Sequence, residues 1–249
     1  MTAHHVDHRL RPTSGAEADH AAAIADRLGV ICVIHRVEVG DGPNLEARAR
    51  EARQQVLPAE HLTGHTADDQ AETMIIRLLR GVGADGLRAM EPGGQHPILR
   101  LRRADTLAVC DLLDVTPVRD PSNDDPRMWR NRVRNELIPL MADIAERDVV
   151  PLLTRTADLL RRDANFISSV SEQIDPTDAK QLATADAVLA RRAIRRWLTI
   201  EGYPPDQAAV ERVLDVARGA ATACEIDGGR RVTRSHQRLR VIDPGQIGE

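Results

Sequence analysis

The stretch VICVIHRVEV, residues 30–39, decides the fold that we expect for this chain. Its β-branched and apolar residues predict a buried strand, and helical patterns flank it over residues 14–28 and 45–57. The residues that precede the first helix have the character of the end of another strand. Strand, helix, strand and helix in this order predict a βαβ unit with a parallel sheet.

Farther along the chain, the apolar spacing favours helices. A strong helix is expected over residues 66–80, and residues 98–118 predict a short strand, a helix and a strand fragment. Later helices are expected at 131–141, 149–170, 186–201 and 205–217, before a terminal β-hairpin formed by RRVTR, SHQ and RLRVI, residues 230–242. We therefore expect an α/β fold with a truncated Rossmann-like parallel sheet in residues 1–145. A mainly helical domain that ends in a β-hairpin should follow in residues 146–249.

Composition excludes several classes of protein. A chain of 249 residues with 42% hydrophobic content can bury a packed core, which excludes disordered and fibrous classes. No apolar run is long enough to span a membrane, and the first ten residues lack the apolar segment of a signal peptide, so a cytoplasmic protein is expected. The three cysteines are far apart, which argues against a disulfide framework or a zinc knuckle.

Charge and aromatic content limit the kinds of partner that this chain is expected to bind. The net charge of -4 argues against a uniformly basic nucleic-acid binder. Among the 34 basic residues only Lys180 is a lysine, and guanidinium groups are suited to bidentate recognition of phosphates and carboxylates. The same bias can also reflect a GC-rich coding sequence. Aromatic residues make up 2% of the chain, so a base-stacking platform is not expected.

The stretch GHTADDQAET, residues 64–73, carries the most informative chemistry. If a helix begins here, one stripe of it presents one imidazole and three carboxylates, those of His65, Asp68, Asp69 and Glu72. Such a cluster can hold a cationic ligand, such as an amine or hydrated magnesium. The alternative is structural, because acidic residues in a first turn also cap the helix and complement its dipole.

Two further stretches are rich in arginine. Glu46, Arg50 and Arg53 share one helix face, which can equally be a solvated, ion-paired surface. After the turn signature Asp120-Pro121-Ser122-Asn123 come four positive charges without an intervening acid, at Arg127, Arg130, Arg132 and Arg134. These suit a phosphate backbone, although a basic face that closes the domain is an alternative.

Together these stretches resemble the tRNA(Ile)-lysidine synthetase family of N-type ATP pyrophosphatases. The segments that carry the resemblance are HVDHRLRP (5–12), NLEARAREAR (44–53), GHTADDQAET continuing into LLRGVGADGL (64–87), and DPSN with RNRVRNELIP (120–139). RRAIRRWL and the terminal GGRRVTRSHQRLRVI are similar to the helical tRNA-binding domain of the family.

The resemblance implies a reaction. ATP and magnesium would serve to adenylate the wobble cytidine of tRNA(Ile) with a CAU anticodon, and free lysine would then displace AMP. It also implies site residues: Asp69 and Glu72 to hold and orient lysine, Arg53 at the adenylate phosphate, His65 and Asp68 in the nucleotide site, and Arg130, Arg132 and Arg134 toward the tRNA. No side chain is assigned as a metal ligand, and a homodimer is left open.

The chain departs from the family pattern in two places. The pyrophosphate loop Ser-Gly-Gly-X-Asp-Ser and the strand before it are absent from the sequence, and the link between Arg53 and His65 is short. We therefore expect an N-terminally truncated or decayed copy, and a non-catalytic tRNA-binding remnant is the alternative function. A thiolating relative would need cysteines at a reactive or cluster-binding spacing, which this chain lacks. A metal-dependent hydrolase would need a second histidine-rich segment, which His4, His5 and His8 could supply.

Overall fold

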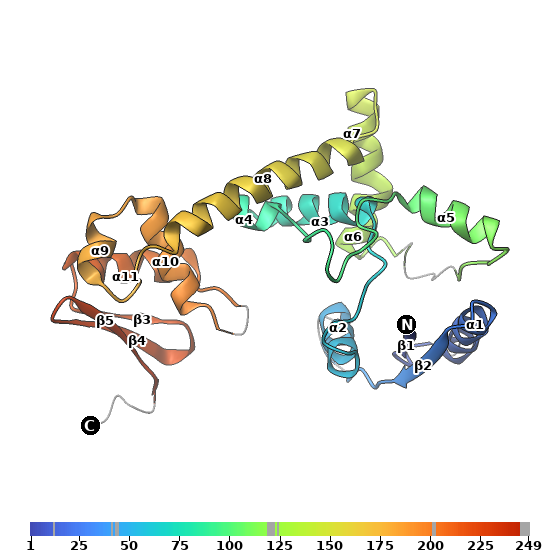
Figure 1. Ribbon diagram of the computed structural model, residues 1–249, viewed down its shortest axis with the longest axis horizontal. Coiled ribbons are helices and arrows are strands. Elements are labelled where there is room, and N and C mark those ends of the chain that lie inside the picture. The colour runs from blue at the N-terminus through green and yellow to red at the C-terminus, as the bar shows by residue number, and fades with distance from the viewer. Residues whose placement is uncertain are drawn as a thin grey trace. The chain divides into compact units, whose positions relative to one another are not determined.

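The computed structural model describes residues 1–11, 13–40, 42, 45–118, 123, 125–200 and 203–244, and for residues 45–47 it describes the backbone alone. The chain forms two compact units, residues 1–157 and 158–249 (Figure 1). Among the described residues, no helix combines the length and the apolar character that crossing a bilayer requires.

The first unit opens with the predicted βαβ arrangement. Its elements are β1 (Thr2–Asp7), α1 (Ser14–Arg27), β2 (Ile31–Arg36) and α2 (Leu45–Val56). The strands pair in parallel, from Thr2 opposite Ile31 to Asp7 opposite Arg36, which confirms the parallel sheet. The expectation of a buried strand was wrong, however, since Ile31 is 72% exposed. In the described chain this sheet has two strands, so much of its surface remains in solvent.

The rest of the first unit is helical. It contains α3 (Ala67–Leu79), α4 (Ala84–Leu87), α5 (Arg103–Leu112), α6 (Trp129–Arg132), the π-helix η2 (Val133–Leu137), α7 (Ile138–Ala145) and the start of α8 (Val150–Ser171). A small core joins α3 to the later helices, with Ala67, Ala71 and Val150 buried against Ile138 and Leu153.

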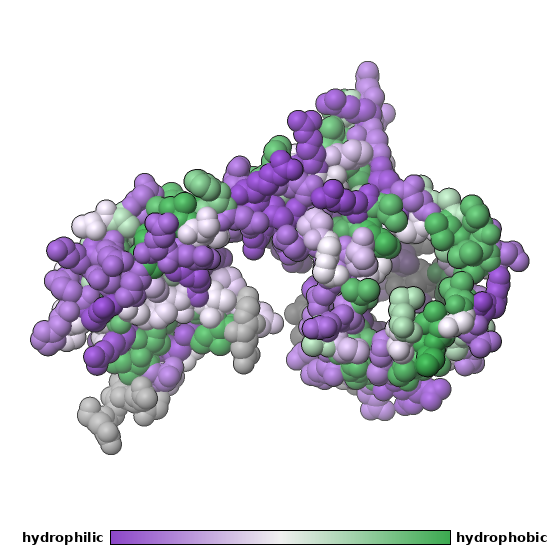
Figure 2. All heavy atoms as spheres, viewed as in Figure 1, coloured by the Kyte–Doolittle hydropathy of each residue, from purple (hydrophilic) through white to green (hydrophobic). Residues whose placement is uncertain are grey.

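The two short strands expected within residues 98–118 do not form among the described residues. The segment around Leu99 is instead a run of turns, in which the Leu99 N–H donates to the His96 carbonyl and the Leu101 N–H to the Ile98 carbonyl. These local bonds use backbone groups that a sheet would need. Helix α5 does form as expected, and Figure 2 shows hydrophobic residues exposed over it, where Leu112 is 86% exposed.

The second unit has a well-packed core. Its elements after α8 are α9 (Ala179–Thr184), α10 (Ala187–Leu198), α11 (Gln207–Arg218), β3 (Ala223–Ile226), the 3-10 turn η3 (Asp227–Gly229), β4 (Arg230–Ser235) and β5 (Arg238–Ile242). The expected terminal hairpin is confirmed as β4–β5, and β3 extends it to an antiparallel sheet in the order β3-β4-β5. Fully buried side chains of Leu182, Ile194 and Val232 pack the three helices against this sheet.

Candidate functional site

The start of helix α3 fixes the position of Asp69. The helix begins at Ala67, with Thr66 as its N-cap, two residues later than a stripe starting at His65 requires. The backbone N–H and the hydroxyl of Thr66 both donate to Asp69 Oδ2 at 2.8 Å, and Asp69 occupies the third position of a capping box, which is typical of a helix start. Burial alone would raise the pKa of Asp69, but these two bonds, with Arg130 and Arg103 nearby, lower it. Asp69 is therefore a carboxylate at neutral pH.

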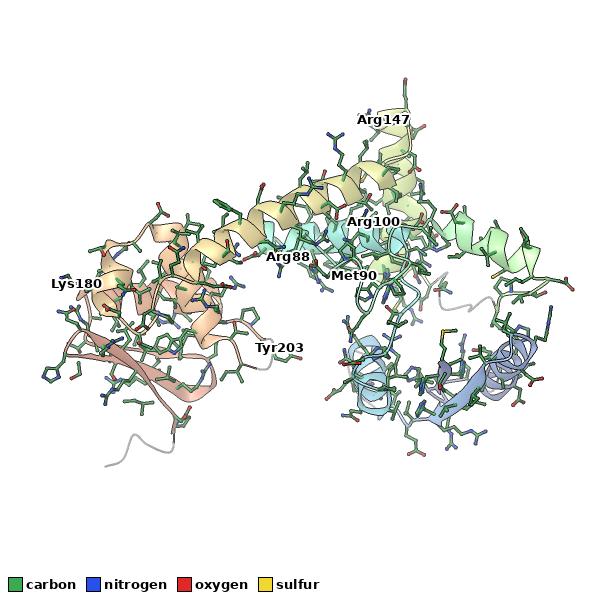
Figure 3. The ribbon with its side chains drawn as sticks, in the orientation of Figure 1. Arg88, Met90, Arg100, Arg147, Lys180 and Tyr203 are labelled. Carbon is green, nitrogen blue, oxygen red and sulfur yellow. The ribbon has the colours of Figure 1, made fainter. Side chains whose placement is uncertain are left out.

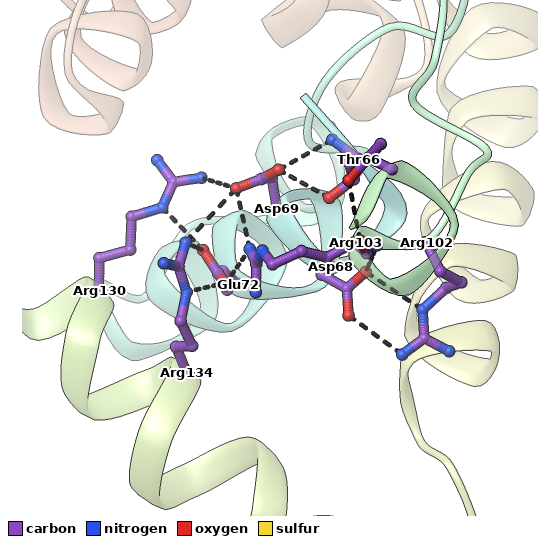
Figure 4. Close-up of polar contacts among 9 residues, drawn as sticks. Thr66, Asp68, Asp69, Glu72, Arg102, Arg103, Arg130 and Arg134 are labelled. Atoms are coloured by element: carbon purple, nitrogen blue, oxygen red, sulfur yellow. Dashed lines mark hydrogen bonds and ion pairs between the residues drawn. The ribbon is translucent and has the colours of Figure 1, made fainter. Parts of the chain in front are cut away.

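Glu72 lies one turn farther along α3 and is 1% exposed. Three guanidinium groups surround its carboxylate (Figure 4). Arg134 donates to both Glu72 oxygens, at 2.7 and 3.1 Å, while Arg130 Nε lies 2.8 Å from Oε2 and Arg103 Nη2 lies 3.0 Å from Oε1. Charges this deep in a protein are retained only when they are paired and hydrogen-bonded, which is the case for Glu72.

The same three arginines also reach Asp69. Its Oδ1 lies 3.2 Å from Arg130, 3.4 Å from Arg103 and 3.6 Å from Arg134. We call Asp69, Glu72, Arg103, Arg130 and Arg134 the arginine–carboxylate cluster. Its formal charges are three positive and two negative, so the cluster has a net charge of one positive unit. An excess of guanidinium groups favours an anion, and phosphate is the anion whose geometry the guanidinium fork matches.

Arg53 of helix α2 adds a further positive charge beside this cluster. Burial lowers the pKa of Arg53, and the positive charges of Arg50 and Arg130 lower it further. An arginine that is both partly desolvated and close to other arginines gains from an anionic ligand, because the anion relieves both penalties.

Asp68 belongs to a separate set of contacts. Its carboxylate accepts from Arg102 Nη2 at 3.0 Å and from the Arg103 backbone N–H at 2.7 Å. Burial opposes ionisation of Asp68, but these bonds outweigh burial and lower its pKa. Arg102 also pairs with Asp148, just before helix α8. The stripe predicted on α3 is thus divided, with Asp69 and Glu72 in one group and Asp68 in another.

His65 precedes the helix and is half-buried. Burial lowers its pKa, Asp69 opposes this shift, and His96, Arg130 and Arg53 add to it. The imidazole is therefore neutral at pH 7 and lies in the field of the arginine–carboxylate cluster.

The arginines that were expected to face the tRNA lie in two different environments. Arg130 and Arg134, expected to face the tRNA, direct their guanidinium groups onto Asp69 and Glu72. Arg132 is 61% exposed and pairs with Glu136 one turn away. Residues 120–122 of the DPSN turn lie outside the described residues.

Arg102 and Arg103 are site residues that the sequence reasoning missed. The Ala67 N–H donates to the Leu101 carbonyl at 2.8 Å, which holds the residues before α5 against the start of α3. A signal for them was present, because LRLRRADT places adjacent arginines directly before a predicted helix, opposite an acidic helix start that needs cations.

A closed set of protein metal ligands is absent from the described residues. Within the described ranges, no three histidine, cysteine, aspartate or glutamate side chains gather closely enough to hold a metal ion. The carboxylates of the cluster are engaged by guanidinium groups instead.

Comparison with known proteins defines the class. Residues 1–141 match the PP-loop domain model, and residues 178–240 match the TilS substrate binding domain model, so this is a PP-loop protein with an appended substrate-binding domain. A tRNA(Ile)-lysidine synthase from Nocardia farcinica is 38% identical over 98% of this chain and 80% of its own length. The chain belongs to the tRNA(Ile)-lysidine synthase family.

Other relatives carry the same name. The tRNA(Ile)-lysidine synthase from Cutibacterium acnes is 35% identical over 90% of this chain and 76% of its own length. The one from Rhodococcus erythropolis is 39% identical over 78% of this chain and 64% of its own length. The similarity therefore extends across both compact units.

Proposed function

We propose that this chain is an ATP-dependent ligase of the cytoplasm that joins free lysine to the wobble cytidine of tRNA(Ile) with a CAU anticodon. The observation that carries the proposal is the arginine–carboxylate cluster, in which three guanidinium groups surround two carboxylates at the start of α3. Its position in a chain of the lysidine synthase family supports a site where a phosphate and an amine meet.

In this proposal the arginines act on the phosphate. Adenylation leaves a phosphate between the base and the adenosine, and AMP then departs with additional negative charge. Preorganised guanidinium groups stabilise such developing charge without having to reorganise. Arg53 and Arg130 are assigned to this phosphate, since Arg53 lies near Arg130 and is partly desolvated.

Asp69 and Glu72 have different parts in the lysine step. Glu72 is almost fully buried with short bonds to three arginines, so we assign it to positioning the guanidinium groups. Asp69 keeps 16% of its side chain exposed, and its cluster contacts are longer, at 3.2 to 3.6 Å. We assign Asp69 to the lysine ammonium, which would replace an arginine at Oδ1. His65 and Asp68 are assigned to the nucleotide site.

Magnesium would be bound together with ATP, since Mg²⁺ at nucleotide sites is usually held by one or two carboxylates and the phosphates themselves, and no step is assigned to it. ATP supplies the adenylate, and the positive charge around Arg53 and the cluster suits its phosphates.

Both segments of the chain are assigned a role toward the tRNA. Residues 1–145 would catalyse its modification, and residues 146–249 would bind it. The terminal hairpin supports the second assignment, because β4 and β5 carry a dense set of guanidinium groups, those of Arg230, Arg231, Arg234, Arg238 and Arg240. Arg132 supplies an exposed cation in the first segment. A homodimer remains a prediction.

Lysine transfer tests the proposal directly. Purified protein is incubated with tRNA(Ile), ATP and labelled lysine, and ATP-dependent label in the tRNA is the expected result. Asp69→Asn should reduce incorporation at least about 100-fold, the usual loss when a catalytic electrostatic contact is removed. Asp111→Asn, an exposed position on α5, is the matched control and should keep wild-type incorporation.

A tRNA-binding protein without chemistry is the second candidate. The observation that favours it is that arginines of the chain itself occupy both carboxylates of the cluster. Salt-sensitive tRNA binding that is independent of ATP, with no label incorporated, would select this second candidate.

A further inference from the structure

The hydroxyl of Thr63 joins two imidazole rings beside the candidate site. Thr63 Oγ1 lies 2.7 Å from Nδ1 of His65 and 2.6 Å from Nδ1 of His96. The rings meet edge to face, with centroids 5.1 Å apart and an interplanar angle of 81°. A third contact, at 3.2 Å, joins the same hydroxyl to the Gln95 carbonyl.

The numbers of protons and lone pairs on the Thr63 hydroxyl decide which group donates and which accepts in each contact. A hydroxyl has one proton and two lone pairs, and a carbonyl oxygen can only accept. All three contacts are hydrogen bonds only if the hydroxyl donates to Gln95 and accepts from an N–H on each Nδ1. Any other arrangement sets two lone pairs against each other. Both rings therefore carry a proton on Nδ1, and a neutral ring in this tautomer has a bare lone pair on Nε2.

Charged and titratable groups from several elements lie around His65. Asp69 of α3 favours a protonated ring, while Arg130 of α6, Arg53 of α2 and the neighbouring His96 oppose it. Burial also opposes protonation and is the largest effect. The ring is therefore neutral at physiological pH and lies beside the carboxylate that we assign to the lysine ammonium.

We propose that Thr63 and His96 are positioning residues that hold His65 with its proton on Nδ1, so that Nε2 accepts a proton from the bound lysine. This inference rests on the proposed function. The ammonium gives one proton to Nε2, and the freed lone pair forms the new carbon–nitrogen bond at the adenylated carbon of the cytosine ring. The bond from that carbon to the adenylate oxygen breaks, and its electron pair leaves with AMP. An ammonium has no lone pair, so the proton must leave before attack.

Nitrogen NMR of the histidine rings tests the positioning role without any activity measurement. In the full chain labelled with ¹⁵N-histidine, His65 should show a protonated Nδ1 and a bare Nε2 at pH 7.5. Thr63→Val removes the hydroxyl at nearly constant volume, and should shift His65 toward the other tautomer. Thr63→Ser keeps the hydroxyl and should restore the wild-type signal. Thr156→Val, which removes a hydroxyl from α8, is the matched control and should leave His65 unchanged.

Single-turnover kinetics test the chemical role. Thr63→Val should slow lysine transfer from preformed adenylated tRNA about tenfold, the factor that one ordinary hydrogen bond represents. His65→Gln should slow transfer about 100-fold, as expected for loss of a general base. Thr63→Ser should transfer lysine at close to the wild-type rate.

The outcomes separate the two proposals. A bare Nδ1 on His65 in the wild type, or a tautomer unaffected by Thr63→Val, overturns the positioning role. The expected tautomer together with full transfer by His65→Gln overturns the proton transfer. A wild-type protein that binds tRNA but transfers no lysine refutes the proposed function itself, whatever the NMR result.

Discussion

Removing the charge of Glu72 is the most informative perturbation of this structure. Glu72→Gln keeps the shape of the side chain but leaves three guanidinium groups facing a neutral amide. Removing one partner of a buried ion pair usually costs about 3–5 kcal/mol. The arginine side chains here are 24–35% exposed, so water screens part of the repulsion among them. We therefore expect a loss near the lower limit, about 3 kcal/mol.

Tryptophan fluorescence can follow this loss in the correct unit. The chain has two tryptophans, Trp129 beside Arg130 and Trp197 in the core of the second unit. In a Trp197→Phe background, urea unfolding followed through Trp129 reports the first unit. A loss of about 3 kcal/mol corresponds to a fall of roughly 6–12 °C in Tm for a domain of this size.

A surface ion pair provides the matched control. Glu136→Gln removes the partner of Arg132, but both side chains are more than half exposed, at 53% and 61%. That substitution should cost less than about 1 kcal/mol. If Glu72→Gln destabilises the first unit no more than Glu136→Gln does, Glu72 does not organise the cluster and the charge argument is refuted.

Three further predictions follow from other contacts. The pKa values of Asp68 and Asp69 are lowered from 3.8 in the folded protein, so their contribution to stability is complete above that value and is lost as pH falls through the lowered pKa. Acid titration followed through Trp129 should therefore show destabilisation below about pH 4, and Asp68→Asn should weaken this dependence. Gln70 is 3% exposed, and its amide accepts from the Met90 N–H at 2.9 Å and donates to the Met90 carbonyl at 3.0 Å (Met90 is labelled in Figure 3). Gln70→Leu removes both bonds, so it should lower the free energy of unfolding by about 2 kcal/mol and speed proteolysis within residues 81–90. Asp206 caps α11 by accepting from the Ala209 N–H, so Asp206→Ala should cost about 1 kcal/mol by Trp197 fluorescence while Asp206→Asn stays near wild type.

The sequence predicted long, strongly periodic elements well. Helix α3 was expected over residues 66–80 and spans Ala67–Leu79, because its apolar spacing buries Ala71, Met74 and Ile75 on one face. Short elements were missed or misassigned. The strand β3 has four residues and the helix α9 has six, too few to show a period above background. Their positions are set by tertiary packing that a local pattern does not contain.

The candidate site was partly accessible to the same reasoning. Spacing alone could place Asp69 and Glu72 near each other, since residues three apart are neighbours on a helix. It could not show which cations face them, because Arg103 and Arg134 lie 31 and 62 positions from Glu72 along the chain. Spacing also could not show that Asp68 pairs with Arg102, which lies 34 positions farther along the chain. Contacts of this range depend on how the helices pack.

The π-helix η2, residues 133–137, makes one stretch of the chain unusually tolerant of the loss of a residue. A π turn contains one residue more than an α turn, and an α-helix advances about 100° per residue. Shortening this segment by one residue could restore a regular helix without unfolding it. The wide turn already absorbs the additional residue, so Trp129 and Arg130 would keep nearly the same direction relative to α7. The same deletion within the regular turns of α7 would instead rotate the preceding residues by about 100° and change which side chains face Glu72.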